Sequence, residues 1–265
     1  MTSAAMIAPT SSSAALAGIR VVDFGHYIAG PMAAMLLGDF GADVVHVDPP
    51  DGPRFDTPAN ATWNRNKRSI ALDLKNADDR EIARRLIDRA DVVIENFRPG
   101  VMDRLGLGPR VMTSRNTRLV YLSLPGFASD DPRAGMRAWE GVLGAATGCY
   151  STNPILKLER PVYNCLPFPS VFGAHWGALA VAVALNERER SGKGQIIEAP
   201  LFAATFTAFS GKAMKVHGKS EPEPLSTWRH ARCKDARWFL YVPRDMHPIL
   251  MREIGFEMPA GGVHA

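Results

Sequence analysis

Residues 19–47, IRVVDFGHYIAGPMAAMLLGDFGADVVHV, decide the fold. The β-branched run Ile19–Phe24 predicts a strand. The Met/Ala/Leu-rich segment Pro31–Phe40 predicts a helix that begins at proline, the preferred first helical residue. Ala42–Val47 follows a glycine and reads as a second strand. A strand, a helix and a strand within about thirty residues predict a β-α-β unit, whose two strands pair in parallel.

Strands and helices continue to alternate beyond this unit. The next runs predict, in order, a strand at Ser69–Leu74, a helix at Asp78–Ala90, a strand at Asp91–Phe97 and a strand at Arg118–Leu124. This alternation predicts a doubly wound α/β sheet. Because ligands of such sheets bind beyond the carboxyl ends of the strands, we expect a site at three loops, which are Gly25–Gly30, Asn96–Gly100 and Pro125–Phe127.

The rest of the chain is predicted to complete one large domain and to begin a smaller one. It reads as a Gly/Ala-rich helix from about Trp139, a helix at Ser170–Arg190, a strand at Gln195–Ala199 and a helix at Pro200–Val216. We expect a disordered tail at 1–17, a large α/β domain at 18–217, a linker at 218–228 and a partial small α+β domain at 229–265. That last segment offers only a strand at Trp238–Val242 and a helix at Pro248–Ile254, too little to enclose its own core.

The composition is that of a globular protein, with 265 residues of which 46% are hydrophobic and 22% are charged. A formal net charge of +4 is too mild for the dense cationic stripe of a nucleic-acid binder, so we expect no nucleic-acid partner. Three cysteines without paired or metal-ligand spacing predict a reducing, cytoplasmic location, no disulfide and no metal. The most apolar stretch, Val171–Leu185, is shorter than the roughly twenty residues of a bilayer span, so we interpret it as a buried helix and expect no membrane association.

Basic residues flank two of the predicted strands. They are Asn66-Lys67-Arg68 with Lys75 around one strand, and Arg98 with Arg104 after the next. Such side chains can converge on phosphate groups, and a solvated basic surface is an equal alternative from spacing alone. The glycine-bounded turn Gly25–Gly30 precedes a helix N-terminus, where anions bind readily, although it lacks the GxGxxG pattern of dinucleotide sites.

Three further polar residues lie in apolar helices. Glu140 would be costly to bury unless it is paired or neutral, and buried carboxyls of that kind are often functional, although a solvent-facing glutamate is the simpler interpretation. Ser170 follows Phe168-Pro169 and is interpreted as a helix N-cap. His175 lies among apolar residues and is interpreted as a satisfied core histidine rather than a catalytic group.

Four ordered motifs point to one family. They are VVDFGHYIAGP at 21–31, NKRSIALDLK at 66–75, DVVIENFRPG at 91–100 and RSGKGQ at 190–195. Together they resemble the class III CoA-transferases, a group that includes formyl-CoA, carnitine-CoA and succinyl-CoA transferases and the α-methylacyl-CoA racemases. The resemblance covers residues 18–200.

The resemblance implies a Rossmann-like large domain that holds coenzyme A, a smaller domain, and a dimer of two interlocked rings. It also implies that acyl-CoA and carboxylic acids are the substrates. The CoA-binding positions of the family fall on these residues: His26, Tyr27, Ile28, Ala29, Leu72, Lys75, Asn96, Phe97, Arg98 and Arg104. Cationic side chains would bind the phosphates, and backbone groups would orient the pantetheine arm.

The catalytic positions of the family are altered here. The aspartate that attacks the acyl thioester in the transferases, and also serves the racemases, is matched by Ser170. The racemase histidine is matched by Trp139, which cannot exchange protons, and a glutamine important in formyl transfer is matched by Ile28. Glu140 matches an acidic residue that lines the pocket in both branches, so Glu140 and Ser170 are the candidate catalytic residues.

These features leave three functional hypotheses. The first is an acyl-CoA:carboxylate CoA-transferase. The second is a catalytically silent or split CoA-binding protein that lacks the nucleophilic aspartate. It is motivated equally by Ser170 and by the resemblance, since family members continue well past residue 265 to a return segment that closes the ring. The third, ranked lower, is a 2-methylacyl-CoA racemase. The expected partner is a second copy of the chain or a complementary C-terminal chain.

Overall fold

The computed structural model describes residues 14–54, 57–150, 161–209, 229–232 and 238–241. The chain divides into two compact units, one of residues 1–150 with 163–213 and one of residues 151–162 with 214–265. The predicted linker at 218–228, the helix at Pro248–Ile254 and most of the predicted tail lie outside the described residues.

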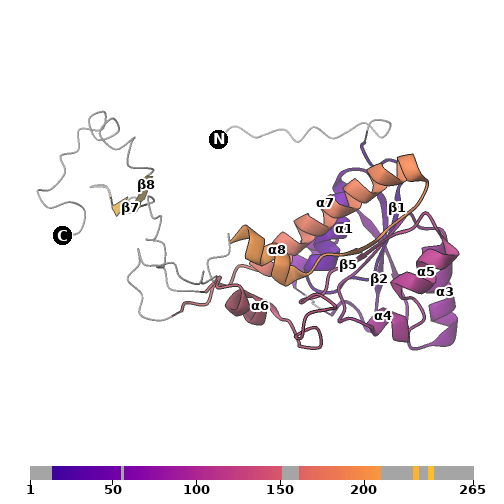
Figure 1. Ribbon diagram of the computed structural model, residues 1–265, viewed down its shortest axis with the longest axis horizontal. Coiled ribbons are helices and arrows are strands. Elements are labelled where there is room, and N and C mark those ends of the chain that lie inside the picture. The colour runs from indigo at the N-terminus through magenta and orange to yellow at the C-terminus, as the bar shows by residue number, and fades with distance from the viewer. Residues whose placement is uncertain (1–13, 55–56, 151–160, 210–228, 233–237, 242–265) are drawn as a thin grey trace, which may run out of the picture. The chain divides into compact units, whose positions relative to one another are not determined.

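The first unit contains a six-stranded parallel sheet (Figure 1). Its strands are β1 (Arg20–Asp23), β2 (Asp43–Asp48), β3 (Lys67–Ala71), β4 (Val92–Glu95), β5 (Val120–Ser123) and β6 (Ile196–Glu198). They lie in the order β3-β2-β1-β4-β5-β6. The predicted α/β fold is thereby confirmed, and its strand order reverses between β1 and β4, the position where doubly wound sheets bind ligands.

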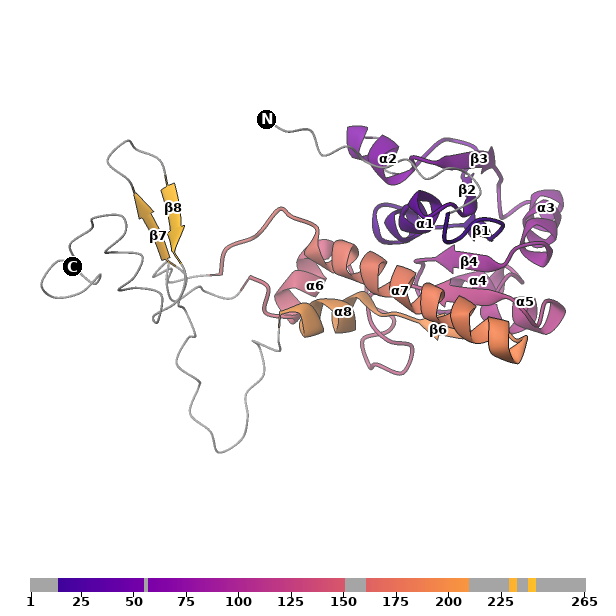
Figure 2. The same ribbon diagram turned by 90° about the horizontal axis from the view of Figure 1, so that it is seen from above.

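Helices cover both faces of this sheet (Figure 2). The helices α1 (Ala29–Asp39) and α7 (Phe168–Ser191) pack against each other on one face, and α3 (Ala77–Asp88) and α5 (Pro109–Arg115) contact each other on the other face. Shorter helices complete the unit: α2 (Pro58–Trp63), α4 (Val101–Arg104), α6 (Glu140–Ala146) and α8 (Leu201–Ala208). Strand residues alternate between two apolar clusters, with Val21 and Ile94 facing α1 and α7, and Val22 and Val93 facing the other side.

Several element boundaries differ from the sequence prediction. The third strand begins at Lys67 rather than Ser69 and ends at Ala71, so the polar residues before the apolar run also pair with β2. Residues 14–17 of the predicted tail form a turn, in which the Leu16 amide donates to the Phe40 carbonyl at 2.9 Å. In the second unit, β7 (Arg229–Arg232) pairs antiparallel with β8 (Trp238–Tyr241). The strand β8 was predicted and β7 was not.

The long helix α7 is buried along one face only. Gly177 lies on the buried face, whereas Trp176, Leu179 and Val183 expose 51%, 61% and 60% of their surface within the described part of the chain. By length and hydropathy α7 is apolar enough to cross a membrane, a test that core helices of soluble proteins also pass. The interpretation of His175 as a core histidine was wrong, because this side chain is exposed, with Nδ1 2.8 Å from the Val171 carbonyl oxygen. An apolar pattern on every face of a helix does not specify which face is covered.

Candidate functional site

The turn after β1 is built on two glycines in direct contact. A Cβ atom added to Gly25 would lie 2.7 Å from the Gly30 Cα, and one added to Gly30 would lie 2.7 Å from the Gly25 Cα. Between them Tyr27 has a φ of 63°, in the left-handed region. The absence of both side chains therefore lets the chain double back tightly before α1 begins.

Asn96 ties this turn to the loop after β4. Its Nδ2 donates to the His26 carbonyl at 2.8 Å, and its Oδ1 accepts from the His26 amide at 2.8 Å. The ring of His26 packs edge-on against Phe97 with 4.9 Å between centroids. Burial lowers the pKa of His26, so this imidazole is neutral at physiological pH. The two loops that the sheet topology selects as a ligand site are thus held together as one surface.

Gly30→Ala tests this close contact. We expect the new methyl group to be forced against the Gly25 backbone. The steric cost outweighs a small gain in helix propensity, so the free energy of unfolding falls by about 2 kcal/mol net. Gly135→Ala is the matched control, because a Cβ atom there meets nothing within 4 Å. Urea unfolding of both variants measures the difference. Equal stability of the two variants would contradict the described turn.

A cleft of about 680 Å³ opens beside these loops, a volume in the range of small-molecule sites. It is lined by residues of the turn, of the loop after β4, of the loop that leads to α6 and of the first turn of α7. Seven of the sequence-predicted site residues line it: Tyr27, Ile28, Asn96, Phe97, Arg98, Glu140 and Ser170. The structure therefore brings together the predicted CoA-binding loops and both candidate catalytic residues.

The other predicted site residues do not line this cleft. Ala29 and Leu72 are buried, so only their backbone groups are available to a ligand. Lys75 follows β3 and Arg104 belongs to α4, which follows β4, so both lie at the carboxyl edge of the parallel sheet. Lys75, Arg98 and Arg104 are all exposed and form no ion pair with the described part of the chain.

Of the two equal interpretations of the basic residues, convergence on phosphate groups does not hold for residues 66–68. Lys67 begins β3 instead of preceding it, so this segment lies toward the amino edge of the sheet. Asn66 donates to Asp39 at 2.7 Å, and Arg68 pairs with Asp43 at 2.7 Å. Lys67 is buried against Asp23 at 2.9 Å. The segment therefore holds the sheet together and is not part of a phosphate site.

Glu140 and Ser170 meet in the cleft from two helices. Glu140 is the first residue of α6, and Ser170 lies in the first turn of α7, where its hydroxyl donates to Glu140 Oε1. Helix α7 begins at Phe168 with Pro167 as its cap, so the interpretation of Ser170 as the N-cap was wrong. Glu140 Oε2 is buried and has no hydrogen-bond partner among the described residues. One oxygen of this cleft-lining carboxyl group is therefore shielded from bulk solvent.

Two opposing effects act on this carboxyl group. Burial raises the pKa of Glu140, and hydrogen bonds from the Ser170 hydroxyl and backbone partly offset the rise by favouring the charged form. A buried carboxyl group of this kind has the chemistry of a general acid, a general base or a carboxylate nucleophile. Trp139 packs against Tyr27 with 5.3 Å between ring centroids at the same cleft. An indole offers no exchangeable acid or base for racemisation.

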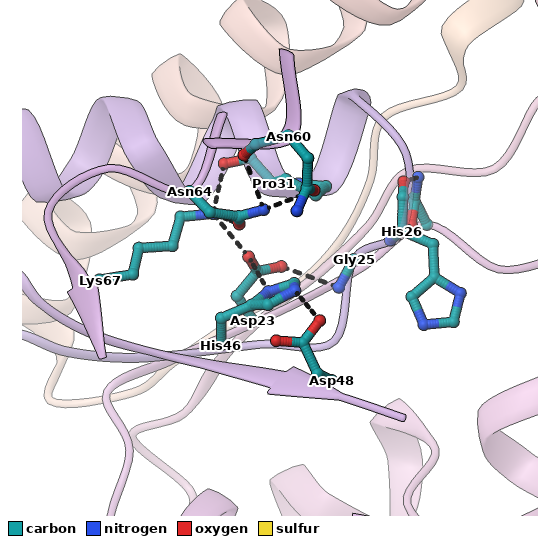
Figure 3. A network of polar contacts seen from close by, with 10 residues as sticks. Asp23, Gly25, His26, Pro31, His46, Asp48, Asn60, Asn64 and Lys67 are labelled. Atoms are coloured by element: carbon teal, nitrogen blue, oxygen red, sulfur yellow. Dashed lines mark hydrogen bonds and ion pairs between the residues drawn. The ribbon is translucent and has the colours of Figure 1, made fainter. Parts of the chain in front are cut away.

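Sequence reasoning missed two buried polar groups close to the cleft. Asp23, His46 and Lys67 form a network beneath the glycine turn (Figure 3). Glu95, the last residue of β4, is 7% exposed, and burial raises its pKa to about 7. The sequence carried the same signal for both groups, since Asp23 and Glu95 are each an acidic residue at the end of a mainly apolar strand.

Comparison with known proteins supports one family. The profile of CoA-transferase family III matches residues 16–248. The chain is 44% identical over 218 residues to a CoA-transferase/lyase DddD of Marinomonas sp. (strain MWYL1). The aligned region covers 81% of this chain and 26% of that protein. It is 33% identical over 249 residues to the succinyl-CoA–L-malate CoA-transferase beta subunit of Chloroflexus aurantiacus, with 86% of this chain and 62% of that protein covered.

A solved structure agrees with these relatives. A CAIB/BAIF family protein from Brucella suis superposes with a TM-score of 0.76 at 29% identity, over 90% of this chain and 69% of that one. The chain spans less than two thirds of the length of both curated relatives. The family profile nevertheless matches most of the chain, through the turn, the loops and the cleft described above, and the chain belongs to CoA-transferase family III.

Proposed function

We propose that this chain binds acyl-CoA and acts in an acyl-CoA:carboxylate CoA-transferase. The observation that carries the proposal is the shared cleft, which joins the Asn96-linked turn to the Glu140–Ser170 pair. A CoA thioester bound along the turn would place its phosphates toward the exposed cations at the carboxyl edge of the sheet. Its thioester carbon would reach the carboxyl group of Glu140.

The transfer needs a carboxylate that can hold CoA, and Glu140 is the candidate within this chain. Its oxygen would attack the thioester carbonyl, the C–S bond would break, and CoA would leave as a thiolate, so that the acyl group remains on Glu140 as a mixed anhydride. The thiolate would then attack the glutamyl carbonyl and release the first carboxylic acid as its carboxylate. An acceptor carboxylate reverses these two steps, which restores Glu140 and yields the new acyl-CoA.

Calorimetry with CoA followed by an exchange assay tests the proposal. We expect CoA to bind, and labelled acyl-CoA to pass its CoA to a carboxylic acid in the presence of the chain, with Glu140→Gln inactive and still able to bind CoA. Absence of heat with CoA would overturn the proposal. Exchange that is equal in Glu140→Gln and the parent would overturn the assigned role of Glu140.

A specific observation favours a second candidate function. Ser170 stands where the resemblance places the family nucleophile, and the chain spans 62% of one relative that is itself named as a beta subunit. A split enzyme, in which a complementary chain supplies the nucleophile, or a catalytically silent CoA-binding protein would show CoA binding without exchange by the isolated chain. Exchange by the isolated chain would exclude both. The racemase hypothesis ranks below these because of Trp139.

The phosphate contacts give a further prediction. We expect Lys75→Ala, Arg98→Ala and Arg104→Ala each to raise the Kd for CoA by about three- to tenfold, because each removes one charge-assisted contact at an exposed site. Titration with dephospho-CoA separates the three, since the cation that binds the 3′-phosphate loses its effect with that ligand. Arg110→Ala, on the exposed surface of α5, is the control and leaves the Kd unchanged. If all four variants bind CoA equally, these cations do not form the phosphate site.

A further inference from the structure

A buried ammonium group lies beneath the turn that the proposed function assigns to CoA. The Lys67 side chain is 1% exposed, and its Nζ donates to Asp23 Oδ2 at 2.9 Å, to the Pro31 carbonyl at 2.8 Å and to Asn64 Oδ1 at 2.8 Å (Figure 3). An ammonium has three N–H donors, so all of its hydrogen bonds are made. The acceptors come from β1, from α1 and from Asn64, the residue that caps the C-terminus of α2, so Lys67 joins three parts of the chain at one point.

Asp23 extends this network to the other end of the turn. The residue is fully buried, and its Oδ1 accepts from the Gly25 amide at 2.8 Å while Oδ2 is 2.8 Å from His46 Nδ1. His46 Nε2 in turn lies 3.3 Å from Asp48. The Gly25 amide is therefore fixed by Asp23 at the entry of the turn, and the Pro31 carbonyl is fixed by Lys67 at its exit.

Stability alone does not account for this arrangement. A buried ion pair adds little net free energy over apolar residues of the same size, because desolvation offsets the attraction. The position is also unfavourable for a cation, since the first turn of α1 presents the positive end of the helix dipole. What the network does achieve is geometric, because it fixes both ends of a turn whose middle is tied to Asn96 through the backbone of His26.

We infer that Lys67, together with Asp23, is a positioning residue that holds the Gly25–Pro31 turn in the form that binds the CoA moiety. The inference rests on the proposed function. Lys67 touches no ligand in this scheme, and it acts through the Pro31 carbonyl and through Asp23. Loss of the network leaves the turn in several conformations, and the Kd for CoA rises by the reciprocal of the fraction that stays competent.

The test uses the double variant Asp23→Asn/Lys67→Met, which removes both buried charges at once and leaves no unpaired ion. Its matched control is Asp91→Asn/Arg188→Met. This second pair joins the buried Arg188 to the partly exposed Asp91 at 3.2 Å, and Asp91 lies just before β4, at the opposite edge of the sheet from the turn. Urea unfolding checks that both variants fold, and calorimetry with CoA and amide hydrogen exchange are then compared.

For the Asp23/Lys67 variant we expect a Kd for CoA about tenfold higher, as for a turn that is competent in about a tenth of the molecules. Hydrogen exchange should accelerate in the peptide that contains residues 24–32 and stay unchanged in α3 and α5. The control variant should bind CoA within twofold of the parent. A Kd within twofold of the parent for the Asp23/Lys67 variant overturns the inference, whatever the exchange at the turn.

The affinity of the parent chain for CoA separates failure of the proposed function from failure of the inference. If the parent chain binds no CoA, the proposed function falls and the inference falls with it, whereas CoA binding by the parent and equally by the variant overturns the inference alone. If the double variant does not fold, Asn64→Ala decides, because it removes one acceptor of Lys67 at a partly exposed helix and keeps the ion pair. An unchanged Kd in Asn64→Ala overturns the inference, and a rise of about threefold or more supports it.

Discussion

Ser170→Asp is expected to raise the rate of CoA exchange by about a hundredfold or more, a lowering of the barrier by about 3 kcal/mol. The side chain at this position lies in the first turn of α7, faces the cleft and already contacts Glu140. A serine hydroxyl can accept an acyl group, but it has no carbonyl carbon that could take up CoA afterwards. A carboxylate at the same place supplies both steps of the transfer.

The neighbouring carboxyl group sets the pH dependence of this gain. Burial already raises the pKa of Glu140, and a second carboxylate within hydrogen-bond reach raises it further, because two adjacent like charges disfavour double ionisation. The pair is therefore expected to release its two protons in two separate steps, with one proton shared between the carboxyl groups in the pH range between them. One carboxyl group can then act as the nucleophile while the other donates a hydrogen bond to the thioester oxygen.

Ser170→Asn is the matched control, since it has nearly the same size and no nucleophilic oxygen. We expect no gain of exchange in this variant, and CoA binding equal to that of Ser170→Asp. Trapping with hydroxylamine, read by mass spectrometry, should modify residue 170 only in Ser170→Asp after incubation with acyl-CoA. Equal rates in the two variants, with CoA binding intact, would show that the thioester does not reach α7 and would contradict the proposed transferase site.

The alternation of strands and helices was predictable because its signals are local. Short β-branched runs, a proline at the start of the first helix and a glycine after its end specify the β1-α1-β2 unit without any distant contact. The edge strand β3 was misplaced by two residues because Lys67 and Arg68 are polar. Only their pairing with β2, which the sequence does not encode locally, makes them part of the strand.

The polar interior was not predictable for the same reason. Lys67 lies 44 positions from Asp23, so nothing in either local pattern shows that the two are joined, and a lysine in a basic segment reads as a surface cation. Glu140 and Ser170, 30 positions apart, were brought together in advance only by the family resemblance. The carboxyl-edge loops were located correctly because strand order and strand direction alone place them at one rim of a doubly wound sheet.

Glu95→Gln is expected to remove a pH dependence of stability that the parent chain shows. Glu95 is buried at the end of β4, and burial raises its pKa from 4.5 to about 7, against hydrogen bonds from Ser123 and the Phe97 amide. The folded state therefore binds more protons at this site than the unfolded state between these two values. By linkage, the free energy of unfolding falls as pH rises through this window, by about 3 kcal/mol in total, and is then constant above it.

The substitution separates this group from all others that titrate in the same range. A glutamine oxygen still accepts from the Phe97 amide, which lies 2.7 Å from the carboxyl oxygen in the parent, and the amide carries no charge to desolvate. We expect equal stability of parent and variant at about pH 4.5, and a variant more stable by about 3 kcal/mol at about pH 8.5, both measured by urea unfolding.

The control for this comparison is Glu189→Gln, whose side chain is 72% exposed in the parent. It removes a solvent-exposed charge instead of a buried one, so we expect its stability to differ from that of the parent by the same small amount at both pH values. The raised pKa of His46, which burial opposes and Asp23 produces, gives a fall in the same direction and is common to all three chains, so it cancels in the difference. Parallel pH profiles for the parent and Glu95→Gln would mean that Glu95 titrates normally, and the carboxyl end of β4 would then have to be open to solvent.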